Sequence, residues 1–212
     1  MSHASYDFAT LPPRDRYKLL IGIVVPRPIA LVTTLSENGV VNAAPFSFFN
    51  VFSEEPAQIV LGIQHRADGT PKDTTRNLGR AQEFCVNMVD EALAETMNLC
   101  ATDFPPDVGE VAALGIEMRP GETVKVPWMA AAPFALECRR SVSLAFTAAR
   151  EIVIGEVVHV HARHGLTDPK TMHTDTDRYR PIGRLAGKQY CRQGEVFELG
   201  RVTYAEWQAG KK

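Results

Sequence analysis

The sequence lacks long apolar segments and any leader-like start. Its longest apolar stretch, residues 19–25, is far shorter than the roughly 20 residues that a membrane-spanning helix requires. Residues 1–7 combine neither a basic start nor an apolar run, so they do not resemble a signal peptide. We therefore expect no membrane segment and no secretion, and we predict a cytoplasmic protein.

An excess of either charge is also absent. The 212 residues contain 23 Lys and Arg against 25 Asp and Glu, which gives a net charge of −2. A general nucleic-acid-binding protein usually carries a basic excess, so we expect no nucleic acid partner. With 45% hydrophobic residues the chain is too apolar for a disordered one. Its length favours one domain over residues 1–212.

Cysteines are few, and no two are close in sequence. Cys85, Cys100, Cys138 and Cys191 show none of the short spacings that zinc knuckles and redox motifs use. The first three lie among apolar neighbours, which predicts buried free thiols rather than a disulfide framework.

The common motifs of catalysis and phosphate binding are missing. There is no Gly-x-Gly-x-x-Gly turn, no Gly-Lys-Ser/Thr loop and no Gly-x-Ser-x-Gly elbow. No cysteine has the basic surroundings of a nucleophile. If the chain is an enzyme, a cofactor must supply the chemistry, and we name no catalytic side chain.

Strand-like segments outnumber helical ones. Asn38-Gly39 is a strong hairpin signal between two of the strands. We expect strands at residues 29–34, 40–44, 57–64, 83–89, 136–146, 151–162 and 195–199, and helices at residues 12–21, 72–81 and 91–101. The regular alternation of strands and helices that marks a parallel sheet is absent. The pattern predicts a mainly β fold, a β-barrel or sandwich with a few peripheral helices.

Residues 42–53 hold four of the ten phenylalanines beside small and polar residues. Small residues allow backbone amides to approach a planar ligand, and Asn or Ser can meet its polar edge. An aromatic strand packed in the core would have the same composition. Composition alone favours the core strand.

A loop at residues 65–71 runs into a predicted helix that begins near Lys72. Free N–H groups at a helix start attract a phosphate, and here Lys72 adds a charge and Thr74 a hydroxyl. An ordinary capped surface helix is the alternative, and it is modestly favoured on local grounds.

His159 and His161 would face the same side of a strand, so a metal site is geometrically feasible. No acidic residue follows at the spacing of known metal motifs. A polar face on a partly exposed strand is the favoured interpretation.

Taken in order, these segments resemble the flavin reductase-like, FMN-binding split-barrel family. The resemblance covers about residues 17–201 and rests on residues 26–34, 42–47, 72–74, 77, 83–87, 136–138, 155–157 and 181–185, and on Tyr190. It implies a six-stranded antiparallel Greek-key split barrel with peripheral helices. It also implies a homodimer with FMN near the subunit interface, although FAD would suit the same site.

The resemblance also implies roles for individual residues. The flavin ring and ribityl chain would be lined by Thr33, Thr34, Asn42, Ala43, Ala44, Phe46 and Ser47, and the phosphate would be held by Lys72, Asp73 and Thr74. Arg27 is either a second phosphate cation or part of a structural ion pair. Tyr190 either flanks the flavin or packs in the structure. Ala186-Gly187 departs from the two glycines that the family often has after Arg184-Leu185.

The implied function is an NAD(P)H-dependent flavin oxidoreductase. NADH or NADPH would deliver hydride to flavin N5, with backbone donors of residues 43–47 stabilising the charge that develops on the flavin. Electrons would then pass to free flavin, a partner oxygenase or another acceptor. Two alternatives remain open: an FMN-binding electron carrier without nicotinamide turnover, and a metal-binding β-barrel that uses His159 and His161.

Overall fold

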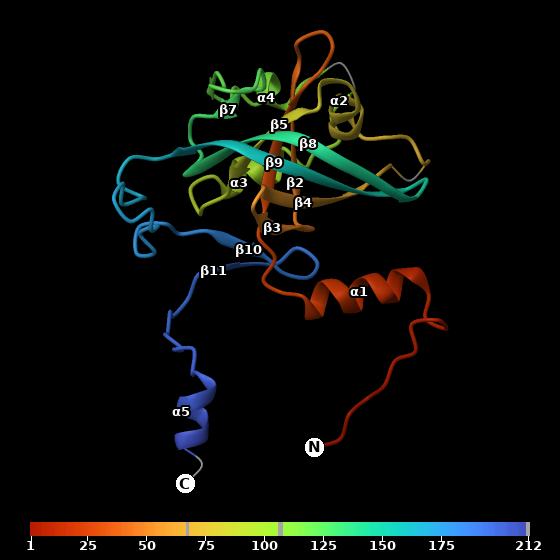
Figure 1. Cartoon of the computed structure of the whole chain (residues 1–212). Coiled ribbons are helices and arrows are strands. Elements are labelled where there is room, and N and C mark those ends of the chain that lie inside the picture. Colours follow the sequence, from red (N-terminus) through yellow and green to blue (C-terminus); the bar gives the residue numbers. More distant parts are fainter. Residues whose placement is uncertain (67, 106–107, 211–212) are drawn as a thin grey trace.

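The computed structural model describes residues 1–66, 68–105 and 108–210 (Figure 1). Its strands are β1 Ala30–Leu35, β2 Val41–Phe46, β3 Phe49–Glu54, β4 Ala57–Gln64, β5 Glu83–Met88, β6 Met118–Arg119, β7 Trp128–Met129, β8 Phe134–Thr147, β9 Arg150–Ala162, β10 Ile182–Arg184 and β11 Tyr190–Arg192. Its helices are α1 Pro13–Ile23, α2 Asp73–Ala81, α3 Ala94–Leu99, α4 Glu110–Ala113 and α5 Tyr204–Ala209. The mainly β fold predicted from the sequence is confirmed.

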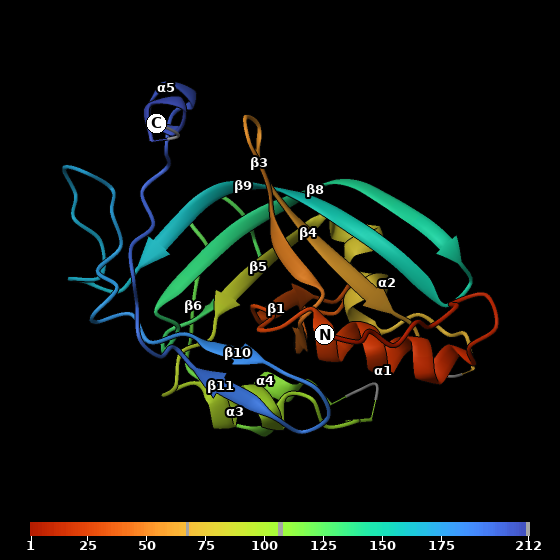
Figure 2. The same ribbon diagram turned by 90° about the horizontal axis from the view of Figure 1, so that it is seen from below.

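The main sheet has seven antiparallel strands in the order β2-β1-β5-β8-β9-β4-β3. It curls strongly, with the long strands β8 and β9 arching over the others (Figure 2). Seven strands replace the expected six because the aromatic segment after β2 reverses and forms a further edge strand, β3. β2 and β3 are thus consecutive in the chain but lie at opposite edges of the sheet.

The inner face of the curled sheet forms one apolar core. Along β4 the buried residues Ile59, Leu61 and Ile63 alternate with less buried ones, as a strand with one face in the core requires. Phe84 fills the centre, and a Cβ on Gly155 would lie 2.4 Å from its ring. The absence of a side chain at Gly155 therefore makes room for Phe84.

A second core lies between the sheet and the helices that cover its outer face. Leu31 and Ala43 from β1 and β2 pack there with Met97 of α3 and Val111 of α4. Ile182 of β10 joins the same cluster. This packing fixes α3, α4 and the β10–β11 hairpin beside strand β2.

Most predicted elements are present with small shifts of their ends. The 57–64 strand is reproduced as β4, and the Asn38-Gly39 hairpin joins β1 to β2 with Gly39 at a φ of 79°. The helix expected at 91–101 is confined to α3. The strand expected at 195–199 is wrong, since these residues pair with no other strand in the described part of the chain. Residue 67 of the predicted 65–71 loop lies outside the described residues.

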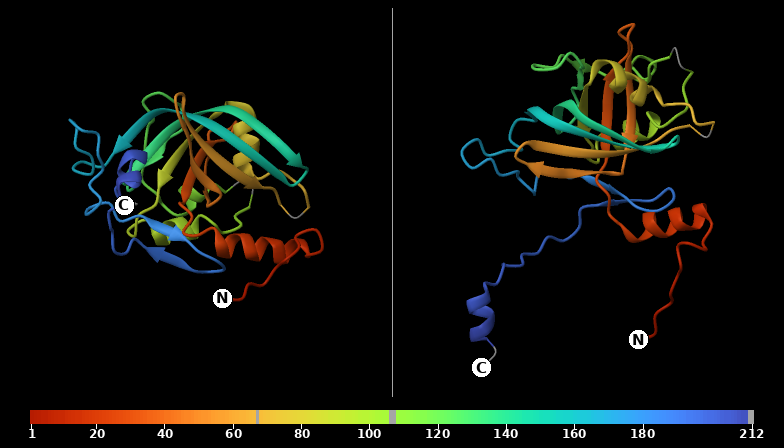
Figure 3. Two further views of the ribbon diagram at one scale, coloured as in Figure 1. Left: turned by 60° about the horizontal axis from the view of Figure 1, so that its bottom comes forward. Right: turned by 45° about the vertical axis from the view of Figure 1, so that its right-hand side comes forward.

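The C-terminal segment extends away from the body of the molecule and ends in α5 (Figure 3). A capping box starts this helix, because Thr203 accepts from the Glu206 amide and the Glu206 carboxylate accepts from the Thr203 amide. α5 nevertheless buries none of its residues. Among the described residues, no helix is long and apolar enough to cross a membrane.

All four cysteines are free, and Cys85, Cys100 and Cys138 are buried, as predicted. Burial raises the pKa of the Cys100 thiol to about 12, with a further contribution from the nearby Glu110 carboxylate. Burial likewise raises the pKa values of Cys85 and Cys138, to which Glu137 contributes. These three thiols are therefore not nucleophiles at neutral pH.

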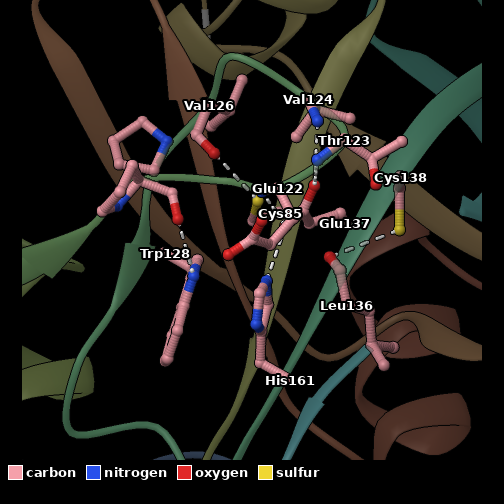
Figure 4. A network of polar contacts seen from close by, with 12 residues as sticks. Cys85, Glu122, Thr123, Val124, Val126, Trp128, Leu136, Glu137, Cys138 and His161 are labelled. Carbon is pink, nitrogen blue, oxygen red and sulfur yellow. Dashed lines mark hydrogen bonds and ion pairs between the residues drawn. The ribbon is translucent and has the colours of Figure 1, made fainter. Parts of the chain in front are cut away.

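A buried carboxylate, Glu137 of β8, anchors the loop before β7 to the barrel (Figure 4). Its oxygens accept hydrogen bonds from the amides of residues 122, 123 and 124 at 2.7–2.8 Å. They also contact His161 Nε2 at 2.6 Å, and the His161 ring stacks on Trp128 with centroids 4.4 Å apart. Burial raises the pKa of this carboxyl, but the amide and histidine hydrogen bonds outweigh it and lower the pKa to about 2.

Replacing Glu137 with Gln should lower the free energy of unfolding by about 2–3 kcal/mol at pH 7, because the charge that three amides face is lost. The folded-state pKa lies below the ordinary value of 4.5, so the carboxylate stabilises the fold above that pH. The difference between wild type and variant should narrow as the pH falls from about 4.5 toward 2. Urea unfolding across this range measures it.

Glu122→Gln is the matched control, since the Glu122 side chain is exposed and only its backbone amide enters the network. A stability loss in Glu137→Gln that stays constant down to pH 2, or that Glu122→Gln reproduces, would contradict the assigned role of Glu137.

Candidate functional site

The chain crosses from one edge of the sheet to the other at residues 47 and 48, between the end of β2 at Phe46 and the start of β3 at Phe49. Phe48 passes close to β4, where the Gly62 amide donates to the Phe48 carbonyl at 2.7 Å. A Cβ on Gly62 would lie 2.9 Å from the Phe48 Cβ, so the crossing depends on glycine at this position. This crossing is where the barrel is split.

Three cavities adjoin the crossing and share Pro45. We call them the Lys72, Phe48 and Tyr190 cavities, with volumes of about 130, 280 and 230 Å³. Lys72 lines the first two, and Phe46 and Ser47 line the last two. Together they form one cleft along the split. Its principal lining residues are Tyr17, Asn42, Ala44, Pro45, Phe46, Ser47, Phe48, Arg66, Lys72, Thr74, Arg184 and Tyr190.

The first turn of α2 opens on the Lys72 cavity. Lys72 occupies the N-cap position without a side-chain cap, so the first N–H groups of the helix lack the partner that a capping residue supplies. The Lys72 side chain is exposed, and its ammonium makes no hydrogen bond or ion pair with the described residues. In the same turn, the Thr75 hydroxyl is buried and has no hydrogen-bond partner in the described part of the chain. This turn has free donors and an uncompensated positive charge.

The two residues that follow Lys72 are held by neighbours. The Asp73 carboxylate pairs with Arg66 at 2.8 Å and also with Arg76. The buried Thr74 accepts a hydrogen bond from Asn42 Nδ2 at 3.2 Å, which ties α2 to β2. Of the three predicted phosphate residues, only Lys72 has its polar group unengaged; Asp73 serves to position Arg66.

The backbone amides of residues 43–47 are mostly engaged, contrary to the sequence-based expectation. The Ala43 amide donates to the Glu110 carboxylate at 2.9 Å. Pairing in the antiparallel ladder alternates, so the amides of Ala44 and Phe46 turn toward β1, and Pro45 has no N–H. The donor that this segment still offers at the cleft is the side-chain hydroxyl of Ser47. This hydroxyl accepts from Arg27 Nε at 3.5 Å, which leaves the O–H free to donate.

Thr33 and Thr34 lie inside the structure rather than at the cleft. Both are fully buried, and neither lines the three cavities. Thr33 Oγ1 donates to the Pro127 carbonyl at 2.8 Å, and Thr34 Oγ1 accepts from Asn77 Nδ2 at 3.0 Å. The Thr33 hydroxyl thus connects the loop at Pro127 to β1, and the Thr34 hydroxyl connects helix α2 to β1. The sequence pattern did not indicate these structural roles.

Arg27 is a structural cation. Its Nη atoms donate to the carbonyls of Ile21, Val24 and Leu185 at 2.7–2.9 Å, which joins the end of α1 to the β10–β11 hairpin. With Ser47, these contacts use four of its five N–H groups. Arg27 forms no ion pair with the described residues, so carbonyl contacts take the place of the ion pair that was one of its two predicted roles. Because its N–H groups are engaged in this way, the structure does not support the other role, binding of a phosphate. Burial lowers the pKa of Arg27; Tyr17 opposes this shift and Arg184 adds to it.

Tyr190 is the first residue of β11, and its side chain lines the cavity that we named after it. The Arg184 guanidinium carbon lies 4.4 Å from the centre of the Tyr190 ring, in a cation–π contact. β10 and β11 pair Arg184 directly with Tyr190, so the hairpin presents both side chains together. The structure therefore places Tyr190 at the cleft, where it also packs against the second core.

Three charged residues that line the Lys72 cavity have no place in the sequence-based prediction: Arg66, Asp103 and Glu110. Arg66 lines it and holds the Pro71 carbonyl at 2.7 Å as well as Asp73; its place in the loop before Lys72 was a signal that could have been used. Glu110 lines the same cavity from α4. Burial raises the pKa of Glu110, which the Ala43 hydrogen bond partly offsets. Glu110 is 67 residues from Ala43, so only the fold reveals this contact.

The two histidines of β9 lie side by side, with ring centroids 4.7 Å apart. His161 is held by Glu137, as described above. Among the described residues, no group of three His, Cys, Asp or Glu side chains is arranged to hold a metal ion. The metal-binding alternative thus has no complete ligand set there.

The curled seven-stranded sheet and the cleft where the chain crosses between its edges are the features of a split barrel. The flavin reductase-like domain family matches residues 23–183, so this chain belongs to the flavin reductase-like family. The membership makes it a flavin-linked oxidoreductase in general terms.

Several proteins are similar over nearly the whole chain. An uncharacterised protein of Deinococcus radiodurans is 46% identical, over 98% of this chain and 94% of its own length. The crystal structure of 2-nitrobenzoate 2-nitroreductase NbaA of Pseudomonas fluorescens is 38% identical with a TM-score of 0.87, covering 95% and 98% of the two chains. Nitrilotriacetate monooxygenase component B of Bacillus cereus is 33% identical with a TM-score of 0.89, covering 94% and 100%.

Proposed function

We propose that this protein binds FMN in the cleft and catalyses NAD(P)H-dependent reduction of the flavin, passing the electrons to a second acceptor. The observation that carries the proposal is the uncapped start of α2. There the Lys72 ammonium has no partner among the described residues and lines two of the three cavities that form the cleft. Family membership supports the flavin. FMN is preferred to FAD because the phosphate donors lie at one end of the cleft.

The phosphate would bind at the start of α2. Lys72 would supply a full charge, and the first N–H groups of the helix would add donors and a partial positive charge. Arg66 lines the same cavity and adds N–H donors, but the Asp73 carboxylate neutralises its charge. Lys72 and the helix start would therefore compensate a dianion locally in a chain whose net charge is −2.

The flavin ring would lie against residues 45–47, between the Phe48 and Tyr190 cavities. A flavin held there would supply the electron sink between a nicotinamide hydride donor and an electron acceptor. The chain itself would provide binding and orientation. Ser47 would donate to the polar edge of the ring, with Arg27 fixing the direction of its hydroxyl. Tyr190 would cover one side of the ring.

The nicotinamide would share this cleft, because the chain carries no separate dinucleotide-binding motif. The electron acceptor could be free flavin, a small organic molecule or an oxygenase. The names of the similar nitroreductase and of the monooxygenase component support the last two. NADH or NADPH preference and the cytoplasmic location stay predictions.

Lys72→Ala should weaken FMN binding by about 10–100-fold, the amount that one charge-assisted hydrogen bond contributes. Riboflavin, which lacks the phosphate, should bind both proteins equally. Lys170→Ala removes another exposed lysine outside the cleft and serves as the control. Titrations followed by flavin fluorescence measure the affinities of all three proteins for FMN and for riboflavin. Unchanged FMN affinity in Lys72→Ala would reject the phosphate assignment.

Anaerobic mixing of the FMN-loaded protein with NADH or NADPH should bleach the visible flavin absorption at about 1 s⁻¹ or faster, within the usual range for enzymes. Stopped-flow absorption records the rate. Dithionite is the control for a reducible flavin. Bleaching by dithionite but by neither nicotinamide would instead support an FMN-binding electron carrier.

We also infer a homodimer. The extended C-terminal segment exposes a series of apolar side chains, and α5 buries none of its residues; the exposed side chains include Val196, Phe197, Leu199 and Tyr204. A single helix of six residues is not stable alone in water, so it needs a surface to pack on. The chain also displays apolar residues on α1 and β3, among them Ile23, Val51 and Phe52. A second copy would cover both.

Removing residues 194–212 should convert a dimer into a monomer without loss of the barrel, because the barrel cores contain no residue of this segment. Light scattering coupled to gel filtration gives the mass of each form, and circular dichroism checks the fold. A full-length monomer at micromolar concentration, or a truncated protein that stays dimeric, would contradict a tail-dependent dimer.

A further inference from the structure

The Tyr190 cavity carries one charge, that of Arg184. Its other lining residues are uncharged, and the polar ones include Ser47, Asn98 and Tyr190. Arg184 Nη2 donates to the Gly187 carbonyl at 2.6 Å, and the guanidinium rests on the Tyr190 ring. These two contacts hold the group in place without neutralising it.

Arg184 differs from the seven described arginines that form ion pairs with carboxylates. Elsewhere in the described part of the chain, carboxylates pair with Arg66, Arg76, Arg80, Arg139, Arg163, Arg178 and Arg192. Arg184 has no such partner there, although it is half-buried. A guanidinium kept at a cavity wall without a counter-ion is suited to an anionic ligand, which it can bind through two parallel N–H groups.

A second guanidinium lies behind the first. Arg27 and Arg184 are joined by a reciprocal pair of backbone hydrogen bonds of 3.0 and 2.8 Å. Arg27 is buried and binds carbonyls and one hydroxyl, so it also has no carboxylate partner among the described residues. Arg27 lines none of the three cavities, but it contacts the lining residue Ser47, so its positive charge lies behind the wall of the Tyr190 cavity.

We propose that the Tyr190 cavity is a subsite for a small planar carboxylate, bound by Arg184 beside the flavin. The proposal rests on the proposed function, because it makes this carboxylate the second reactant: a reducible group on the same molecule would take a hydride from the reduced flavin and a proton from solvent, and the carboxylate itself would stay unchanged. The flavin phosphate is assigned to the opposite end of the cleft, at Lys72, so Arg184 is free for the second reactant.

The size and walls of the cavity define the ligand further. Its volume of about 230 Å³ is below the usual range for drug-sized ligands, roughly 300–1,000 Å³, so a single ring fits the space. Phe46 and Tyr190 offer aromatic surface, and Met97 adds a polarisable contact. An aromatic monocarboxylate matches both the apolar walls and the single charge of Arg184.

Benzoate and its neutral isostere benzamide test the proposal directly. Titrated into the FMN-loaded protein and followed by the change in flavin absorption, benzoate should bind at least about ten-fold more tightly than benzamide. Arg184→Gln should abolish this preference. Arg192→Gln should retain it, since Arg192 is an exposed arginine eight residues away that pairs with Glu91 and lines a different cavity.

Equal binding of benzoate and benzamide by the wild type would overturn the proposal, as would an unchanged preference in Arg184→Gln. A selective loss of FMN relative to riboflavin in Arg184→Gln would also overturn it, because Arg184 would then hold the flavin phosphate. If the protein binds no flavin, the proposed function fails. Calorimetric titration of the flavin-free protein with the same two ligands then still decides whether the anion subsite exists.

Discussion

Strands β2 and β3 follow one another in the chain but belong to opposite edges of one curled sheet. The chain must therefore cross the opening of the barrel within two residues, 47 and 48, and the crossing cannot be covered by a neighbouring strand. Gly62 allows Phe48 to approach β4 closely, and Arg27 ties the end of α1 to the β10–β11 hairpin next to Ser47. The cleft exists because these contacts keep the two edges apart.

The charges along the cleft explain how a slightly acidic chain can bind anions. Seven arginines in the described residues pair with carboxylates, whereas Lys72 at one end of the cleft and Arg184 at the other do not. Each sits on an element that another interaction fixes: Asn42 and Thr74 hold α2, and Tyr190 supports Arg184. Two separated positive groups suit two anionic ligands placed along one surface, a flavin phosphate and an acceptor carboxylate.

The sequence predicted the barrel strands well, since strands such as β4 show alternating burial that matches their apolar pattern. It also located residues 42–47 and Lys72, because the chemistry of these residues is evident from their types alone. It failed where partners are distant: Glu110 takes the Ala43 amide, and the hydroxyls of Thr33 and Thr34 point into the structure. Composition cannot show which face of a strand a short polar side chain occupies. Only the fold showed that residues 49–54 form another strand and that 195–199 do not.

The central claim is that flavin lies along the split with its phosphate at the start of α2. A crystal structure of the FMN-loaded protein tests this most directly. The account predicts the phosphate within hydrogen-bond distance of Lys72 Nζ, about 3 Å, and the flavin ring against residues 45–47. A phosphate bound beside Arg184, or a flavin outside this cleft, would contradict it.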